Sequence, residues 1–360
     1  MQAKAGIMSV MNIKKNASLA DYTSFKVGGP AENLILLDIQ DTLSDVLSKI
    51  DDVNLWVLGG GTNTLISDEG LPGTVIINSA GSAKLIDGTT ITANSSTDWD
   101  ELVRFAIKHN LYGLEFMSGI PGTVGGAVVG NIAAYGQKLA DTLKEIDTYD
   151  TRTQETKTLK KDELGFDYRF SNLQEARNRH LVILDATFQL SKKPTSQLEY
   201  ESALKVAAEL KTVPHSLEDR RTIIMETRKR AGSLLSKAGT EHATAGSFFR
   251  NPLVNENQVE KILSYEEAGI SKDKLLRQNT LHGGNSMRVS AAHVLLAAGF
   301  KRGQSWGKVR LHPDHILKIE NTGGASAQDI YDVVELILAT VQSKLDIKLE
   351  PEVRFLGHFN

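Results

Sequence analysis

The sequence predicts a mixed α+β protein with more than one domain. At 360 residues the chain is longer than a typical single domain. Apolar runs typical of strands alternate with amphipathic helices up to about residue 190, which favours a mixed sheet over a helical bundle. After a polar link over residues 191–196, helical periodicity predominates. We therefore expect two α+β sub-domains followed by a further domain.

Composition restricts the chemistry available to the chain. Apolar residues make up 41% and charged residues 24%, as in ordinary globular proteins. The chain has no cysteine, which excludes disulfides, iron–sulfur clusters, thiolate zinc sites and cysteine nucleophiles. Any redox chemistry must therefore come from a bound cofactor.

Neither a polyanion nor a membrane is indicated as a partner. The net charge is −3 and the basic residues are dispersed, so no nucleic-acid partner is expected. No run approaches the roughly 20 apolar residues that a membrane helix needs. The first 16 residues are mixed and polar, unlike a secretory signal, and Met8 and Met11 are alternative starts. We expect a cytoplasmic protein, and a monomer.

The first predicted elements end in a glycine triplet. Residues 23–30 are turn-forming, residues 31–38 form a strand, and Asp41 caps a short amphipathic helix. A buried strand over residues 54–58 then runs directly into Gly59, Gly60 and Gly61, followed by Thr62 and Asn63. Such a loop offers main-chain N–H donors and two polar side chains that suit a pyrophosphate.

Two interpretations of this triplet remain open. The spacing is not G-x-G-x-x-G and no helix obviously follows, so a Rossmann dinucleotide fingerprint is excluded. The alternative is a simple glycine turn between two strands.

A second glycine-rich stretch, GLEFMSGIPGTVGGAVVGNIAAYG, occupies residues 113–136. Strands over residues 74–78 and 90–93 and a helix over residues 98–109 precede it. Glycine disfavours both helix and strand, so we interpret these glycines as giving a flat or anionic cofactor close access to the backbone. The alternatives are a glycine-rich hairpin or a close helix crossing at residues 126–130.

The rest of the chain continues the mixed pattern. Short strands are predicted near residues 146–150 and 180–190, and helices over residues 202–210, 217–232 and 326–345. Ser326 and Asp329 form a capping box for the last helix. A final strand over residues 347–355 contains Glu352.

Several common catalytic motifs are missing. Residues 303–308 lack the spacing of a phosphate loop, and no G-x-S-x-G is present. His312 and His315 lie three apart, but Pro313 argues against a helix between them, so no metal site is predicted. ATP-driven, zinc-dependent and esterase chemistries are disfavoured together.

Six segments, taken in order, resemble the UDP-N-acetylenolpyruvoylglucosamine reductases, and they span most of the chain. They are residues 23–30, 58–64, 113–136, 168–171, 245–252 and 349–357. The glycine triplet is weak evidence, because other flavoproteins of the vanillyl-alcohol-oxidase type share it. Ser-Phe-Phe-x-Asn-Pro and Pro-Glu-Val-Arg-Phe are far more specific.

The resemblance implies a FAD-binding fold of the vanillyl-alcohol-oxidase (PCMH) type and a C-terminal α+β substrate-binding domain. After a lead-in over residues 1–20, the FAD-binding domain would cover residues 21–192, in sub-domains of about 21–80 and 81–192. The substrate-binding domain would cover residues 193–345. Residues 346–360 would return Glu352 to the active site.

The resemblance also implies the cofactor and both substrates. FAD would be bound non-covalently, NADPH would reduce it and leave, and UDP-N-acetylglucosamine enolpyruvate would take its place and be reduced to UDP-N-acetylmuramate, a peptidoglycan precursor. The pyrophosphate of FAD would be held by Gly59, Gly60, Gly61, Thr62 and Asn63. The flavin would lie along Ile120, Pro121, Gly122, Thr123, Gly125, Gly126 and Ile132.

The implied catalytic residues are Arg169, Ser247 and Glu352. Arg169 would hold the substrate carboxylate, Ser247 would donate a proton, and Glu352 would orient the carboxylate. Taken singly, each has a plain structural interpretation: a stacked surface arginine, a turn residue, and the end of an edge strand. Their joint order along the chain favours the catalytic roles.

Further residues match substrate-contacting positions. These are Tyr135, Asn251 and Tyr200, the last matching the loop tyrosine that covers the substrate in the larger subgroup of the family; His315 would line the pocket. Many relatives carry a lysine where this chain has Ala231, with Lys229 and Arg230 just upstream. The cation that meets the diphosphate is therefore open.

Two other functions are consistent with the sequence. One is a flavin oxidase of the same superfamily, which would pass electrons to oxygen. The other is a catalytically silent nucleotide-binding module.

Overall fold

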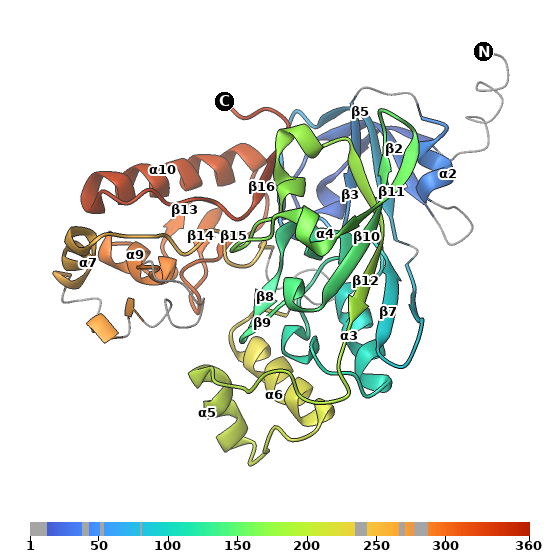
Figure 1. Ribbon diagram of the computed structural model, residues 1–360. Helices are drawn as coiled ribbons and strands as arrows, with labels where there is room; N and C mark the ends of the chain where they lie inside the picture. Colours follow the sequence, from blue (N-terminus) through green and yellow to red (C-terminus); the bar gives the residue numbers. More distant parts are fainter. Residues whose placement is uncertain are drawn as a thin grey trace. The chain divides into compact units, whose positions relative to one another are not determined.

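The computed structural model describes residues 13–37, 43–50, 54–79, 81–234, 243–265, 271–273, 275–276 and 287–360 (Figure 1). The chain divides into two compact units. Unit 1 comprises residues 1–17, 31–61 and 72–234, and unit 2 comprises residues 18–30, 62–71 and 235–360. No helix in the described ranges is long and apolar enough to cross a membrane.

Unit 1 contains a four-stranded sheet in the order β1–β2–β5–β3. Its strands are β1 (Ile13–Ser18), β2 (Pro30–Leu37), β5 (Leu71–Asn78) and β3 (Leu55–Leu58). The pair β3 and β5 is parallel. Helix α2 (Leu43–Leu47) buries Leu43, Val46 and Leu47 against apolar residues of β2 and β5. Asp41, expected to cap this helix, lies outside the described residues.

The second sheet of unit 1 is antiparallel, in the order β11–β10–β12–β7–β6. Its strands are β11 (Glu155–Lys160), β10 (Leu143–Asp150), β12 (Leu181–Gln189), β7 (Thr90–Asn94) and β6 (Ala83–Leu85). Helices α3 (Trp99–Lys108) and α4 (Val124–Gly130) share one apolar core with these strands. The predicted helix over residues 98–109 is confirmed: Asp98 is its N-cap. A short hairpin of β8 (Ala133–Ala134) and β9 (Gln137–Lys138) follows α4.

Helices α5 (Glu201–Glu209) and α6 (Leu217–Arg230) also belong to unit 1. They pack around the fully buried Phe116, and Arg220 of α6 forms a buried 2.9 Å ion pair with Glu115. The division at Leu234 thus differs from the boundary expected at residue 193, because apolar burial and this ion pair hold α5 and α6 to unit 1.

In the ranges that the structure describes, unit 2 combines a small antiparallel sheet with helices. The sheet order is β13 (Ser305–Trp306), β14 (Val309–Leu311) and β15 (Ile319–Asn321), and the helices are α7 (Glu256–Leu263), α9 (Ala291–Ala297) and α10 (Ala327–Leu345). Strand β4 (Thr64–Ile66) pairs in parallel with β16 (Arg354–Leu356). This pairing explains why residues 62–71 belong to unit 2.

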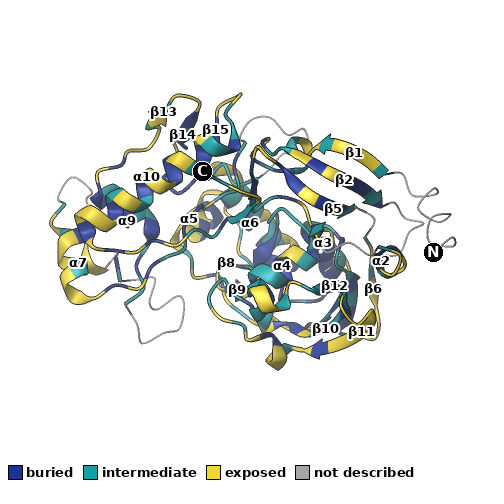
Figure 2. Cartoon of the chain, turned by 90° about the horizontal axis from the view of Figure 1, so that it is seen from above, coloured by how far each residue is buried: buried dark blue, intermediate teal, exposed yellow. Residues whose placement is uncertain are grey.

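The sequence pattern predicts α10 well. Ser326 and Asp329 form the expected capping box, and α10 buries Ile330, Val333 and Val334 on one stripe while exposing its other face (Figure 2). The strand expected over residues 347–355 is wrong in extent, since regular pairing is limited to Arg354–Leu356. Pro351 lacks an N–H donor and leaves only an isolated bridge to Phe249.

Single turns of 3₁₀ helix link these elements. They are Ala20–Tyr22, Glu115–Met117, Leu139–Asp141, Lys161–Leu164, Asn172–Gln174 and Ala176–Asn178.

Candidate flavin and substrate site

The glycine triplet after β3 presents unpaired main-chain donors. Gly61 has a φ of +59°, a left-handed conformation that glycine adopts readily. In the part of the chain that the structure describes, the N–H groups of Gly59, Gly60 and Gly61 donate no hydrogen bond. Successive free N–H groups in such a turn form a concave binding site for an anion.

The triplet lies against the second glycine-rich segment within unit 1. A Cβ added at Gly59 would lie 2.6 Å from Oγ1 of Thr123, closer than any side chain tolerates. Gly126 is exposed, and a Cβ there would meet only that same oxygen, at 3.6 Å. The two segments thus form one glycine-rich surface with few side chains, which we call the glycine cradle (residues 59–61 and 122–126).

The start of α4 is occupied by protein hydrogen bonds. Val124 N–H donates to Thr97 O at 2.9 Å, Gly125 N–H to Ser95 O at 2.8 Å, and Gly126 N–H to the N-cap Thr123 Oγ1 at 3.3 Å. These three amides therefore have acceptors already, whereas the amides of the triplet donate no hydrogen bond in the described structure.

Neither a hairpin nor a close helix crossing describes residues 124–130. Residues 124–130 form a helix and not a hairpin. Gly125 does pack closely, with a virtual Cβ 3.0 Å from Ser95 Cβ, whereas Gly126 and Gly130 meet no neighbouring helix. Close packing explains one glycine of this helix and leaves Gly126 for a ligand.

Charged residues of two helices hold the loop before the cradle. Gly119 N–H donates to Asp100 Oδ1 at 2.6 Å, and Arg221 of α6 binds both oxygens of Asp100, at 2.6 and 2.7 Å. Burial opposes the ionisation of Asp100, but the hydrogen bonds from Arg221 and Gly119 outweigh it and lower its pKa. The following residues, Ile120 to Thr123, are fixed by Trp99 N–H donating to Gly122 O at 2.9 Å.

Removing the Asp100 charge is expected to loosen this loop. In Asp100→Asn the bidentate pair with Arg221 is lost, and FAD affinity should fall about tenfold, equivalent to roughly 1.4 kcal/mol. Flavin fluorescence during titration of the apoprotein measures it. Glu101→Gln, one residue along α3 and 3.6 Å from Arg104 on the surface, is the matched control and should leave FAD affinity unchanged. Equal affinity in both variants would contradict the role of Asp100.

Arg169 lies at a strained backbone position. It has a φ of +53°, in a tight turn where Asp167 and Phe170 exchange main-chain bonds of 3.1 Å. Gln174 Nε2 donates to Arg169 O at 3.1 Å, and Asn131 Nδ2 donates to Asp167 O at 2.8 Å. A left-handed non-glycine residue costs about 1–2 kcal/mol, and such strain concentrates at functional sites.

Two tyrosines lie near Arg169 in unit 1. The rings of Tyr135 and Tyr200 meet edge to face, 5.5 Å apart at 73°. Burial raises the pKa of Tyr200, and the charge of Arg169 opposes that shift. Burial likewise raises the pKa of Tyr135, and the charge of Arg228 opposes that shift. One region of unit 1 therefore contains four side chains that interact with one another in pairs: Arg169, Tyr135, Tyr200 and Arg228.

Arg228 is a site residue that the sequence analysis missed. Its Nη2 donates to Ser233 O at 2.8 Å, and its Nε is buried with no hydrogen-bond partner in the described structure. Burial lowers its pKa. The available signal was its spacing from Arg221, since seven residues are two helical turns and place both arginines on one face of α6.

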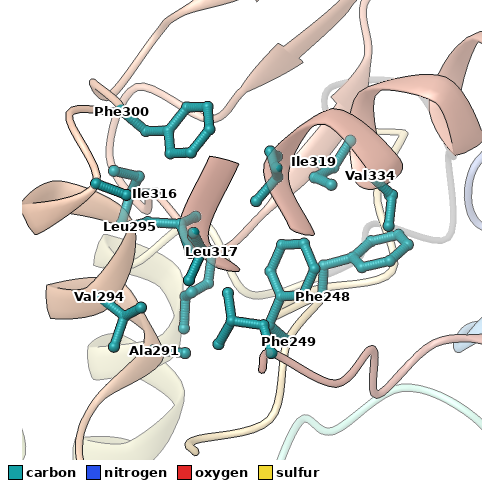
Figure 3. Packing of buried hydrophobic residues seen from close by; sticks show 14 of the residues in the cluster. Phe248, Phe249, Ala291, Val294, Leu295, Phe300, Ile316, Leu317, Ile319 and Val334 are labelled. Carbon is teal, nitrogen blue, oxygen red and sulfur yellow. The ribbon is translucent and has the colours of Figure 1, made fainter. Parts of the chain in front are cut away.

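In unit 2 the main chain that carries Ser247 lies beside the main chain that carries Glu352. The exposed Ser247 precedes Phe248 and Phe249, which are buried in the core beside Leu317 and Ile319 (Figure 3). Glu352 N–H donates to Phe248 O at 2.7 Å. Two anchored phenylalanines and a main-chain bond thus fix both segments.

Asn63 and Asn251 support the same region of unit 2. Asn63 Nδ2 donates to Glu352 O at 3.0 Å, and Asn63 O accepts from Arg354 N–H at 3.0 Å. Asn251 Oδ1 accepts from Ala291 N–H at 2.9 Å, at the start of α9. Each of these predicted ligand-binding residues therefore has a supporting role in the fold.

His315 is buried enough to lose its usual basicity. Burial and, next, the charge of Lys318 lower its pKa from 6.5 to about 4. Its Nδ1 has no hydrogen-bond partner in the described structure. His312 Nδ1 accepts from Asp314 N–H at 3.1 Å, and no cluster of three potential metal ligands occurs among the described residues. His315 is therefore a neutral imidazole at pH 7.

The low pKa of His315 predicts acid sensitivity. Between pH 6.5 and 4 the unfolded chain binds a proton at this residue and the folded chain does not, so stability falls as the pH falls through this window. At pH 5 the loss should be about 2 kcal/mol relative to pH 8. Urea unfolding at both pH values should show a loss smaller by that amount in His315→Asn. An identical pH dependence in the variant would contradict the assignment.

Comparisons with known proteins address the identity of the chain. Residues 34–158 match the family described as "FAD binding domain", and residues 230–356 match "UDP-N-acetylenolpyruvoylglucosamine reductase, C-terminal domain". A UDP-N-acetylenolpyruvoylglucosamine reductase of Thermobifida fusca is 31% identical over 350 residues, covering 95% of this chain and 98% of that protein. The chain belongs to the UDP-N-acetylenolpyruvoylglucosamine reductase family.

Other members of this reductase family agree in length and fold. The reductase of Tropheryma whipplei is 34% identical over 315 residues, covering 84% of this chain and 88% of that protein. The crystal structure of the reductase from Thermus caldophilus has a TM-score of 0.63 at 23% identity, covering 96% of this chain and all of that one. The predicted PCMH-type FAD-binding fold with a C-terminal domain of this reductase family is confirmed.

Proposed function

We propose that this protein reduces UDP-N-acetylglucosamine enolpyruvate to UDP-N-acetylmuramate with NADPH, through non-covalently bound FAD, in peptidoglycan precursor synthesis. The observation that carries the proposal is the glycine cradle in a chain of this reductase family. A Cβ at Gly59 would collide with Thr123, and the triplet keeps three free N–H donors. The residues present therefore fit an anionic, flat cofactor.

Bound FAD would supply the hydride chemistry that links NADPH to the vinyl carbon of the substrate. The N–H groups of Gly59, Gly60 and Gly61 bind its pyrophosphate. Gly122 and Gly126 leave backbone uncovered for the flavin ring. The chain has no cysteine for covalent attachment, and in this proposal the cofactor is held by these contacts alone.

Three residues act on the substrate in this proposal. Hydride addition to an enol ether places negative charge on the adjacent carbon, shared with the carboxylate. Arg169 binds that carboxylate with two parallel N–H bonds. Glu352 orients the same group, and Ser247 protonates the carbon.

The remaining unit 1 side chains bind the sugar nucleotide. We assign Tyr200 as the tyrosine that covers the substrate, which places this chain in the larger subgroup of the family. Its contact with Tyr135 and the residue Arg228 support this assignment. Arg228 lies one turn before Ala231 and offers a buried cation to an anionic substrate group, where many relatives use a lysine.

The stoichiometry of the anaerobic reaction tests the proposal. Without oxygen, each NADPH consumed in turnover should yield one UDP-N-acetylmuramate, and when the enolpyruvyl sugar is omitted NADPH consumption should stop at one equivalent per flavin. Consumption that needs oxygen and yields peroxide would identify a flavin oxidase instead. Protein that binds no flavin would identify a silent nucleotide-binding module. We place the activity in the cytoplasm, where its product would be used, and expect a monomer.

A further inference from the structure

A buried lysine lies directly opposite Ser247. Lys318 is 2% exposed, and it pairs with Ser247 in an antiparallel bridge. The adjacent main-chain bond runs from Phe248 N–H to Leu317 O at 2.8 Å, so Ser247 and Lys318 occupy a non-hydrogen-bonded position. At such positions the two side chains share a face of the sheet, with Cβ atoms about 4.5–5.5 Å apart.

This face of the sheet is polar, while the opposite face lies in the core. Along the strand, Leu317 and Ile319 point into the apolar cluster with Phe248 (Figure 3). Lys318 and Glu320 alternate with them and so point the other way. Glu320 is 2% exposed and accepts from Arg310 Nε at 2.6 Å across the β14–β15 pair.

The polar face continues onto the next chain segment. His312 is fully buried, and its N–H donates to Lys318 O at 2.9 Å. The charge of Lys318 is felt by His315, whose pKa it helps to lower. Lys318 therefore acts electrostatically on its neighbours, and in the proposed function the neighbouring Ser247 is the residue that protonates the substrate.

A lysine side chain is rarely buried, because its charge loses the favourable contact with water. Removing an ammonium group from water costs several kcal/mol unless partners offset the cost. The position of Lys318 beside the proposed proton donor gives the charge a use.

We propose that Lys318 is a positioning residue that stabilises the alkoxide left on Ser247. The inference rests on the proposed function, in which the Ser247 hydroxyl protonates the substrate carbon. The O–H bond breaks, its electron pair remains on Oγ, and the new C–H bond uses the electron pair of the carbanion. The ammonium of Lys318, which is itself buried, stabilises the resulting negative oxygen by electrostatic attraction. A proton from solvent then restores the hydroxyl.

A double-mutant cycle on the substrate half-reaction tests the inference. NADPH first reduces the flavin without oxygen, and the enolpyruvyl sugar is then mixed in while flavin absorbance is followed. Lys318→Met should slow reoxidation at saturating substrate about 10²-fold, with the half-saturating substrate concentration and the NADPH step unchanged. Lys318→Arg should be reoxidised at least tenfold faster than Lys318→Met. In a Ser247→Ala background, Lys318→Met should add less than about twofold, because the two residues act as one device.

A second lysine of unit 2 provides the control. Lys344 of α10 donates from Nζ to Ala298 O at 2.8 Å, and Lys344→Met should leave both half-reactions unchanged. Should Lys318→Met lose its flavin or its cooperative thermal transition, Lys318→Gln enters the same cycle. Wild-type reoxidation in Lys318→Met or Lys318→Gln, or effects that multiply with Ser247→Ala, would overturn the role of Lys318. Wild-type reoxidation in Ser247→Ala alone would instead overturn the proposed role of Ser247.

Discussion

Ser247→Ala is expected to slow flavin reoxidation by the enolpyruvyl sugar about 10²- to 10⁴-fold, because positioned proton transfer contributes that much to rate. NADPH should reduce the flavin of this variant at the wild-type rate, since that step needs no proton from Ser247. Anaerobic stopped-flow absorbance measures both steps separately.

The structure makes this variant a clean probe. Ser247 is exposed, and its segment is held by Phe248, Phe249 and main-chain bonds that the substitution leaves intact. The free energy of unfolding should therefore change by less than about 0.5 kcal/mol. Ser305→Ala, which removes another hydroxyl of unit 2, is the control. Equal slowing of both half-reactions would show that Ser247 serves the fold and not the chemistry.

Gly126→Ala should weaken FAD binding at least tenfold while the apoprotein becomes no less stable. The added methyl group meets only Thr123 Oγ1, at 3.6 Å, so folding can accept it, and alanine favours a helix over glycine by up to about 1 kcal/mol. The same methyl group fills the cradle. A variant that keeps or gains stability but loses FAD affinity shows that Gly126 contacts the ligand. A glycine needed for packing would instead lose stability when substituted.

Gly88→Ala is the matched control for this prediction. A Cβ at Gly88 meets nothing within 4 Å, and the residue lies outside the cradle. Both FAD affinity and the free energy of unfolding should stay near wild type there. If Gly126→Ala binds FAD as tightly as Gly88→Ala does, the flavin does not lie against Gly126.

Local patterns predict the regular elements well. The capping box at Ser326 and the apolar stripe of Ile330, Val333 and Val334 define α10, and Asp98 marks the start of α3. In these two segments the helical repeat of apolar residues is enough to predict the structure. Strands β1, β4, β14 and β15 were missed, because three or six residues carry too little periodicity to distinguish a strand from a loop.

Long-range pairing explains what the sequence leaves undetermined. Residues 62–71 belong to unit 2 because Thr64 pairs with Arg354, nearly the whole chain away. Helix α6 belongs to unit 1 through a buried ion pair between Arg220 and Glu115, which no local pattern reveals.

The site residues also divide into those that local sequence predicts and those that only the fold reveals. The free donors of the triplet and the open surface at Gly126 could be anticipated from glycine alone, since glycine lacks the side chain that would cover them. Arg228 and Lys318 could not, because a charged residue in a polar sequence context is ordinarily solvated, and only the fold buries these two.

The most direct measurement is a single anaerobic turnover of the purified flavoprotein. NADPH should bleach the flavin, and the enolpyruvyl sugar nucleotide, added without oxygen, should restore the oxidised spectrum with one equivalent of UDP-N-acetylmuramate formed. Bleached flavin that regains its colour only when air is admitted would contradict the account.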